Sequence, residues 1–358
     1  MISGLYIHIP FCVKKCNYCD FYSIGGGDTV SDGYVDAVIN EINKYPNMQY
    51  KTVYFGGGTP SLLTPQQTEK ILSAVTILPN AEITLEANPE TVTFEKLKGY
   101  FDAGINRLSF GVQTVKPDSL TTLGRIHSVE KVKQAFNNAQ KAGFVNISGD
   151  VMIGLPDYTN EELDATVELL HSLGATHISS YMLKIEEGTP FAKNTPQNLP
   201  DEDRMCDFYL YACEKIKAMG YTQYEISNFA KPGFESRHNT IYWKLENYLG
   251  IGPSAHSCID GKRFYYLRDI KAFMENPKTV DDGQVDADEY IMLSLRLKTG
   301  LNLAELKGKW NKELTPVQLK KLKMLEKQGY ITFENDNIIS LTPKGFLMEN
   351  AIACEIML

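Results

Sequence analysis

Three cysteines near the start of the chain are the residues whose spacing most clearly predicts chemistry. Cys12, Cys16 and Cys19 form a CxxxCxxC run. Three thiolates from one short loop can bind three corners of a cubane iron–sulfur cluster, in which each iron normally takes one Cys ligand. The fourth iron then lacks a protein ligand and is open to a small chelating molecule. The run therefore predicts a [4Fe-4S] cluster with one open iron.

A structural zinc site is the alternative for the same residues. His8 would complete a Cys₃His set with the three cysteines. Structural zinc sites usually contain a second CxxC pair, and none follows here, so the spacing favours the cluster. The remaining cysteines are scattered and are expected to be structural: Cys206, Cys213, Cys258 and Cys354.

The cysteine count also bears on the compartment. The chain has 7 cysteines, an odd number, and cluster ligands must stay reduced. No signal-peptide pattern precedes Leu5, and no apolar run reaches the ~18 residues that a membrane span needs. These features predict a cytoplasmic protein without a transmembrane segment.

Composition limits the classes of partner. With 358 residues and 43% hydrophobic content, the chain is long enough for a full core and a smaller second unit. Its formal net charge of -8 disfavours nucleic acid, whose binding depends on Lys and Arg neutralising phosphates. We therefore expect no nucleic-acid partner.

Apolar runs alternate with amphipathic segments through the first half of the chain. The expected strands are Leu5–Ile9, Thr52–Phe55, Glu82–Ala87, Arg107–Val112, Asn146–Ile153 and His177–Ile185. Helix-start signals stand between them at Thr64, Thr93 and Thr159. Six such units predict an α/β fold with an incomplete parallel (β/α)6 barrel. We expect the barrel at 1–230, a connecting segment at 231–285 and a second domain at 286–358.

Polar residues and glycines gather where the expected strands end. The second strand is followed by Gly57, Gly58 and Thr59, the third ends at Glu86, and the fourth and fifth carry Gln113 and Asp150. Each has a simpler explanation, as a turn, a helix cap or a buried carboxylate. Because the carboxyl ends of parallel strands share one edge, their joint occurrence predicts a ligand site beside the cysteine loop.

Together these residues resemble the radical S-adenosylmethionine (SAM) proteins related to oxygen-independent coproporphyrinogen III oxidase. The resemblance covers nearly the whole chain. It implies that Cys12, Cys16 and Cys19 bind the cluster and that Tyr6 lies beside it. It also implies that SAM contacts the residues of the GGGTP loop and further strand-end positions, namely Gly57, Gly58, Thr59, Glu86, Gln113, Arg125 and Asp150. For Arg125 the simpler explanation is solvated surface.

Two features bear on the activity within this family. The oxidases carry a further cysteine after the cluster run and an N-terminal extension, whereas here Phe21 occupies that position and the first strand begins at Leu5. The resemblance therefore does not predict decarboxylation.

The second feature is the segment from Arg237 to Trp243, which is similar to the HNxxYW segment of the family's haem chaperones. This similarity implies His238 as an axial haem ligand and Tyr242 and Trp243 as aromatic contacts. The residue types alone favour a packed core cluster, with His238 hydrogen-bonded to backbone and Tyr242 and Trp243 packed beside it. His256 and Cys258 are weaker candidates for a second ligand.

The segment from about Asp286 changes character. Short helical patterns precede two strand-like runs, Gly329–Phe333 and Ile338–Leu341, which predict a winged-helix-like domain. Its lysines and arginine are matched in number by Asp and Glu, so we expect a lid or docking role rather than DNA binding.

The sequence therefore predicts a chaperone that binds haem and a SAM-coordinated [4Fe-4S] cluster and transfers haem to acceptor proteins. An oxygen-independent coproporphyrinogen III oxidase is the alternative, and a regulator that senses through a cluster is a third. Peripheral contact with membrane haemoproteins and a dimeric state are both compatible with the sequence.

Overall fold

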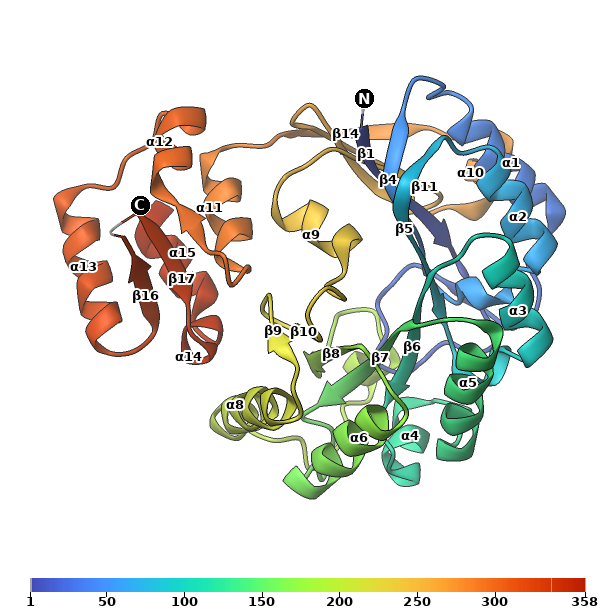
Figure 1. Cartoon of the computed structure of the whole chain (residues 1–358), viewed down its shortest axis with the longest axis horizontal. Coiled ribbons are helices and arrows are strands. Elements are labelled where there is room, and N and C mark those ends of the chain that lie inside the picture. Colours follow the sequence, from blue (N-terminus) through green and yellow to red (C-terminus); the bar gives the residue numbers. More distant parts are fainter. Residues whose placement is uncertain (1, 336, 358) are drawn as a thin grey trace.

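The computed structural model describes residues 2–335 and 337–357. Figure 1 shows a curved open sheet with helices along its outer side and a smaller unit, drawn in orange and red, at one side of the sheet. None of the described helices is long and apolar enough to cross a membrane.

The centre of the sheet is the expected incomplete barrel. Within the described residues its parallel strands lie side by side in chain order: β1 (Ile2–Ile9), β4 (Gln49–Gly57), β5 (Ile77–Ala87), β6 (Arg107–Gln113), β7 (Asn146–Ile153) and β8 (His177–Met182). The helices that connect and cover them are α1 (Asp32–Ile42), α2 (Pro65–Ser73), α3 (Phe94–Asp102), α4 (Pro117–Leu123), α5 (Val129–Ala142), α6 (Asn160–Ser172), α7 (Pro190–Lys193) and α8 (Glu202–Ala218). The predicted fold class is confirmed, although β8 ends three residues before the expected Ile185.

Local sequence signals explain where these helices begin. The hydroxyls of Thr64, Thr93 and Thr159 accept hydrogen bonds from backbone N–H groups in the first turns of α2, α3 and α6. Thr64 also forms a reciprocal capping box with Gln67. Side-chain oxygens at this position satisfy donors that the helix itself leaves unpaired.

Segment 231–285, which the sequence predicted to be a connection, extends the same sheet. It contributes α9 (Arg237–Trp243), α10 (Ile270–Glu275) and the strands β11 (Tyr248–Ile251), β12 (His256–Ile259), β13 (Lys262–Tyr266) and β14 (Thr279–Gln284). β11 pairs parallel with β1, and β12 to β14 follow antiparallel. The opposite edge carries β10 (Asn228–Ala230) and β9 (Thr222–Gln223). These strands were missed because most are short, and β14 is almost entirely exposed and lacks apolar alternation.

Short elements complete the region around the cysteines. They are the small parallel pair β2 (Phe11–Cys12) and β3 (Ile24–Gly25) and the 3₁₀ turns η1 (Pro60–Leu62) and η2 (Pro89–Thr91). η1 and η2 follow β4 and β5 directly, so they shape the carboxyl-end loops of those strands.

The C-terminal unit has the predicted winged-helix-like order. Its elements are α11 (Ala287–Leu295), β15 (Leu301–Asn302), α12 (Leu303–Trp310), α13 (Pro316–Lys327), β16 (Ile331–Glu334), β17 (Ile338–Leu341), α14 (Pro343–Phe346) and α15 (Glu349–Met357). The expected hairpin is β16 paired with β17, and β15 pairs on the other side of β17.

A polar junction links this unit to the sheet. The guanidinium of Arg296 lies 5.3 Å from the ring centroid of Trp243 and 3.5 Å from a carboxylate oxygen of Glu349. The backbone N–H of Ile226 donates to the Arg296 carbonyl at 3.0 Å. Arg296 therefore joins the end of α9, the β9–β10 region and α15.

Candidate cofactor and ligand site

Two adjoining cavities open at the carboxyl ends of the barrel strands. The first, of about 370 Å³, is called the cysteine cavity here; its lining includes the three cysteines of the CxxxCxxC run and Gly58, Gln113, Arg125 and Asp150. The second, of about 500 Å³, is called the aromatic cavity; its lining includes Tyr6, Tyr22, Tyr54, Tyr181, Tyr242, Tyr248, His256 and Arg268. Asp20, Phe21, Gly57, Glu86 and Tyr181 line both. The two cavities therefore share a wall.

The cysteine loop is held by contacts from distant strands. All seven cysteines of the chain are described, and none forms a disulfide. The hydroxyl of Thr59 donates to Cys12 Sγ at 3.5 Å, and Arg125 Nη1 donates to Cys16 Sγ at 3.4 Å. Polar groups around thiolate ligands are a common means of tuning metal–sulfur sites.

Both ring nitrogens of His8 are hydrogen-bonded to groups other than the cysteines. Its Nδ1 lies 2.9 Å from the Tyr6 hydroxyl, and its Nε2 lies 2.8 Å from the Tyr22 carbonyl oxygen. Burial lowers the pKa of His8 to about 4, so the ring is neutral near pH 7. Both ring nitrogens are occupied, which leaves the Cys₃His zinc alternative without its fourth ligand.

The glycine loop after β4 packs directly on the cysteine loop. Gly57 has φ = 112°, a conformation that side chains rarely adopt, and a Cβ there would lie 2.6 Å from the His8 ring. A Cβ at Gly58 would lie 2.7 Å from the Phe11 carbonyl oxygen. The N–H of Thr59 donates to that carbonyl at 2.8 Å. Only glycine allows this close approach of the two loops.

Glu86 lies in the wall between the cavities. Tyr54 donates its hydroxyl hydrogen to Glu86 at 2.7 Å, and the Gly57 N–H donates to the other carboxylate oxygen at 3.3 Å. Burial raises the pKa of Glu86 to about 7, with a further contribution from the charge of Asp150. Glu86 is therefore poised between its protonated and charged forms, and these contacts are not those of a helix cap.

Asp150 on β7 is half-buried beside Ser109 of β6, whose hydroxyl donates to it at 3.1 Å. Burial raises the pKa of this carboxyl group. The carboxylate is hydrogen-bonded, as the simpler explanation expected, but it is half-buried and also lines the cysteine cavity.

Gln113 ends β6 in an unusual backbone conformation. Its φ is 68°, and the pairing of β6 with β7 shifts register between Gly111 and Gln113. Bulges and left-handed non-glycine residues are frequent at functional sites, where they redirect a side chain. The Gln113 side chain lines the cysteine cavity.

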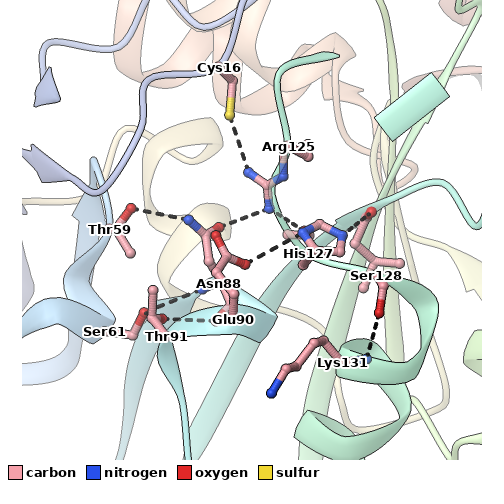
Figure 2. Close-up of polar contacts among 12 residues, drawn as sticks. Cys16, Thr59, Ser61, Asn88, Glu90, Thr91, Arg125, His127, Ser128 and Lys131 are labelled. Atoms are coloured by element: carbon pink, nitrogen blue, oxygen red, sulfur yellow. Dashed lines mark hydrogen bonds and ion pairs between the residues drawn. The ribbon is translucent and has the colours of Figure 1, made fainter. Parts of the chain in front are cut away.

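Arg125 follows α4 and is not a solvated surface residue (Figure 2). Besides Cys16, its guanidinium donates to Asn88 Oδ1 at 2.9 Å and to the Gly111 carbonyl. Asn88 Nδ2 in turn donates to the Thr59 hydroxyl at 3.2 Å. Arg125 Nε is buried without a hydrogen-bond partner among the described residues. This donor is the kind of group that a bound ligand would satisfy.

A supporting pair beneath Arg125 was not anticipated from the sequence. His127 Nε2 donates to the Val112 carbonyl at 3.2 Å, and its Nδ1 lies 3.5 Å from a carboxylate oxygen of Glu90 (Figure 2). Glu90 follows β5 within η2, next to Asn88 and Pro89. The Asn88-Pro89 step directly after the expected strand was the one sequence feature that could have indicated a functional loop here.

The segment that resembles HNxxYW forms α9; Ser236 is its N-cap, and Glu82 accepts two further N–H groups of its first turn. The backbone N–H groups of Arg237 and His238 donate to the two Glu82 carboxylate oxygens at 3.1 and 3.0 Å. His238 is 0% exposed. Its Nδ1 lies 2.7 Å from the Thr52 hydroxyl and its Nε2 lies 2.7 Å from the Tyr242 hydroxyl. Burial lowers the pKa of His238 to about 3.

The expected haem-contacting residues are therefore separated. Tyr242 and His238 lie along the wall of the aromatic cavity, whereas Trp243 packs at the junction with the C-terminal unit. His256 reaches the same cavity from β12, and Cys258 is buried against Ile241 and Tyr248. Arg268, Tyr22 and Tyr181 were missed, because single residues with no motif around them give no sequence signal.

Comparison with known proteins agrees with this architecture. The family model for the radical SAM superfamily matches residues 6–170, and the model for the HemN C-terminal domain matches residues 282–348. The heme chaperone HemW of Bacillus subtilis is 36% identical, over 98% of this chain and 98% of that protein. The chain belongs to the HemW family.

Other relatives of the HemW family extend the match. HemW of Lactococcus lactis is 33% identical over 98% of this chain and 96% of that protein, and HemW of Escherichia coli is 38% identical over 82% of each. The solved structure of coproporphyrinogen III oxidase (HemN) from E. coli has a TM-score of 0.83, with 23% identity, 99% of this chain and 89% of that chain covered. At this identity the likeness shows a shared fold.

Proposed function

We propose that this chain is a haem chaperone, which binds haem and a SAM-coordinated [4Fe-4S] cluster and transfers haem to acceptor proteins in the cytoplasm. The observation that carries the proposal is the similarity to heme chaperones over 98% of both chains. The acceptor proteins, a peripheral contact with membrane haemoproteins and a dimeric state belong to the same proposal, and no nucleic-acid partner is proposed.

The cysteine cavity suits the cluster and SAM. Cys12, Cys16 and Cys19 are unpaired thiols on one loop and line one cavity, as ligands to three corners of a cubane would. When bound, such a cluster would supply an open iron that a small molecule can chelate and an electron that could be transferred to that molecule.

The residues around the cavity offer complementary groups for SAM. The Gly57–Thr59 backbone approaches closely, and the Arg125 guanidinium, with its unsatisfied Nε, would hold a carboxylate. Glu86 and Asp150 carry acceptors for hydroxyl or ammonium groups, and Gln113 adds an amide. Tyr6 lines the neighbouring aromatic cavity and, through His8, supports the glycine loop.

The domain assignment is part of this proposal. We propose residues 1–230 as the radical SAM barrel, 231–285 as the segment that carries the haem motif, and 286–358 as the winged-helix-like unit. Arg296 joins this last unit to Trp243, which supports a docking role for it. Tyr242 and His238 support the placement of haem beside α9, because both line the aromatic cavity.

Coproporphyrinogen oxidation is the second candidate and is less well supported. Phe21 stands where the resemblance implies a further cysteine in the oxidases, and its side chain is 65% exposed at the rim of both cavities. The relatives at more than 30% identity over nearly the full length are heme chaperones.

The test combines haem transfer with turnover. Protein reconstituted anaerobically should contain about four irons per chain, bind added haem, and pass it to an apo-haemoprotein, with no conversion of coproporphyrinogen III above background. Cys16→Ser should lose the iron, whereas Cys206→Ser, on the outer helix α8, should keep it. Turnover of coproporphyrinogen, or wild-type protein that binds no haem, would overturn the proposed function.

A further inference from the structure

The aromatic cavity contains more ligand chemistry than the HNxxYW-like segment alone. Its volume of about 500 Å³ falls in the range of about 300–1,000 Å³ typical of small-molecule sites. Tyrosine rings, three histidines and one arginine line it. The histidines differ sharply in how free their ring nitrogens are, and this difference selects one of them.

Two of the three histidines are fully engaged by the protein. His8 contacts Tyr6 and the Tyr22 carbonyl, and His238 contacts Thr52 and Tyr242, in each case through both ring nitrogens. His238 is also stacked at 5.0 Å on the Tyr54 ring. For either imidazole to bind a metal, a buried hydrogen bond would first have to break, which would leave its partner unsatisfied.

His256 at the start of β12 is different. Its side chain is 53% exposed, and its ring stacks on Tyr265 with centroids 4.9 Å apart. Nδ1 lies 3.7 Å from a carboxylate oxygen of Asp282 on β14, whereas Nε2 has no hydrogen-bond partner within the described part of the chain. Metal-binding histidines commonly direct one ring nitrogen to a carboxylate and the other to the metal. At 3.7 Å the contact is longer than a hydrogen bond, but it places the Asp282 carboxylate on the Nδ1 side of His256 and leaves Nε2 free for a metal.

Two further features of this corner fit an anionic metalloporphyrin. Burial outweighs the charge of Asp282 and lowers the pKa of His256, so the imidazole is neutral and able to bind iron near pH 7. Arg268 lines the same cavity, is exposed, and forms no ion pair among the described residues. An unpaired guanidinium is a suitable partner for a carboxylate such as a haem propionate.

We propose that Nε2 of His256 is the axial iron ligand of haem in the aromatic cavity and that Arg268 pairs with a propionate. The proposal rests on the haem-chaperone function. His238 then acts as a positioning residue, because its hydrogen bond fixes the Tyr242 hydroxyl at the cavity wall.

Titration of haemin into anaerobically prepared variants tests the assignment. His256→Ala should change the Soret band and weaken haemin binding at least tenfold, and His256→Met should bind haemin with a shifted band, because a thioether replaces the imidazole. Arg268→Gln should weaken binding while leaving the band position unchanged. His238→Ala should keep the imidazole-type spectrum. His171→Ala, on the outer face of α6, is the matched control and should behave as wild type.

Iron content and circular dichroism confirm that each variant is folded. If His256→Ala and His256→Met keep the wild-type spectrum and affinity, the ligand assignment is wrong while the proposed function stands. If His238→Ala alone loses the imidazole spectrum, the ligand is His238 and the proposal is overturned. If wild type itself binds no haemin, the proposed function falls and this inference with it.

Discussion

At the scale of single residues, burial rather than residue type decides what the polar groups of the site can do. Glu86 and His238 are both ionisable, yet burial keeps the first partly protonated near pH 7 and the second neutral. The spacing of the cysteines and glycines was readable from the sequence because each motif is local. The free nitrogen of His256 was not, because it depends on which neighbours the fold supplies.

The raised pKa of Glu86 gives a stability prediction with a definite sign. Between pH 4.5 and about 7 the folded state binds a proton that the unfolded state has lost, so the contribution of Glu86 to stability falls as pH rises. Glu86→Gln removes this pH-dependent contribution. Relative to wild type, the free energy of unfolding of the variant should therefore rise by roughly 2–3 kcal/mol from pH 4.5 to pH 7. Denaturant unfolding at several pH values measures it, and a pH-independent difference would refute it.

The lowered pKa of His238 predicts the opposite slope. Between about pH 3 and pH 6.5 the unfolded state binds a proton that the folded state excludes, so the contribution of His238 rises with pH and is lost in acid. Relative to wild type, the free energy of unfolding of His238→Gln should therefore fall by roughly 2–3 kcal/mol as the pH increases from 4.5 to 6.5. The same denaturation series serves as the measurement. A slope of the same sign as for Glu86→Gln would contradict the assignment.

At the scale of elements, the sequence was most informative where a segment is buried on both faces or carries a capping residue. The parallel strands and the starts of α2, α3 and α6 were predictable for this reason. The antiparallel extension was not, because short or exposed strands gain their stability from pairing rather than from an apolar pattern. That extension brings Asp282, His256 and Arg268 together from three separate segments.

The carboxylate of Glu82 should be worth more than an ordinary helix cap. It accepts two backbone N–H groups of α9 and faces the buried Arg107, whose charge it offsets. Glu82→Ala should cost roughly 3 kcal/mol of unfolding free energy, because the buried Arg107 would lose the larger of its two carboxylate partners and keep only Asp150. Thr64→Ala, which removes only the cap of α2, should cost about 1 kcal/mol. Equal costs in urea unfolding would show that the Arg107 interaction contributes nothing.

At the scale of the whole molecule, the C-terminal unit contacts the sheet through several groups, among them the Arg263–Glu289 ion pair, a backbone bridge between Glu225 and Leu297, and the Arg296 guanidinium. Arg296 lies over Trp243 and beside the buried carboxylate of Glu349. The sequence predicted the existence of this unit and its hairpin. The sequence did not predict which face of this unit contacts the sheet, nor that Trp243 lies at the junction rather than in the cavity. Both depend on contacts between residues more than fifty positions apart in the chain.

Removal of this guanidinium should loosen the docking. In Arg296→Ala, Trp243 loses a cation–π contact of ~0.5–2 kcal/mol, and Glu349 loses its charge partner. We expect a red shift of tryptophan fluorescence and faster proteolysis between the barrel and the C-terminal unit. Lys271→Ala, which removes only an exposed ion pair with Glu275, is the control and should resemble wild type. Unchanged proteolysis of Arg296→Ala would show that other contacts hold the junction.

The open sheet has two free edges, and their character bears on how the protein behaves at high concentration. An unpaired strand edge is a template for pairing with further copies, which leads to aggregation. Here one edge is β9, only two residues long, and the other is β14, whose sequence TVDDGQ carries two aspartates and a left-handed glycine, Gly283. Both edges thus discourage strand addition, so a sheet that does not close into a full barrel is protected against edge-to-edge aggregation.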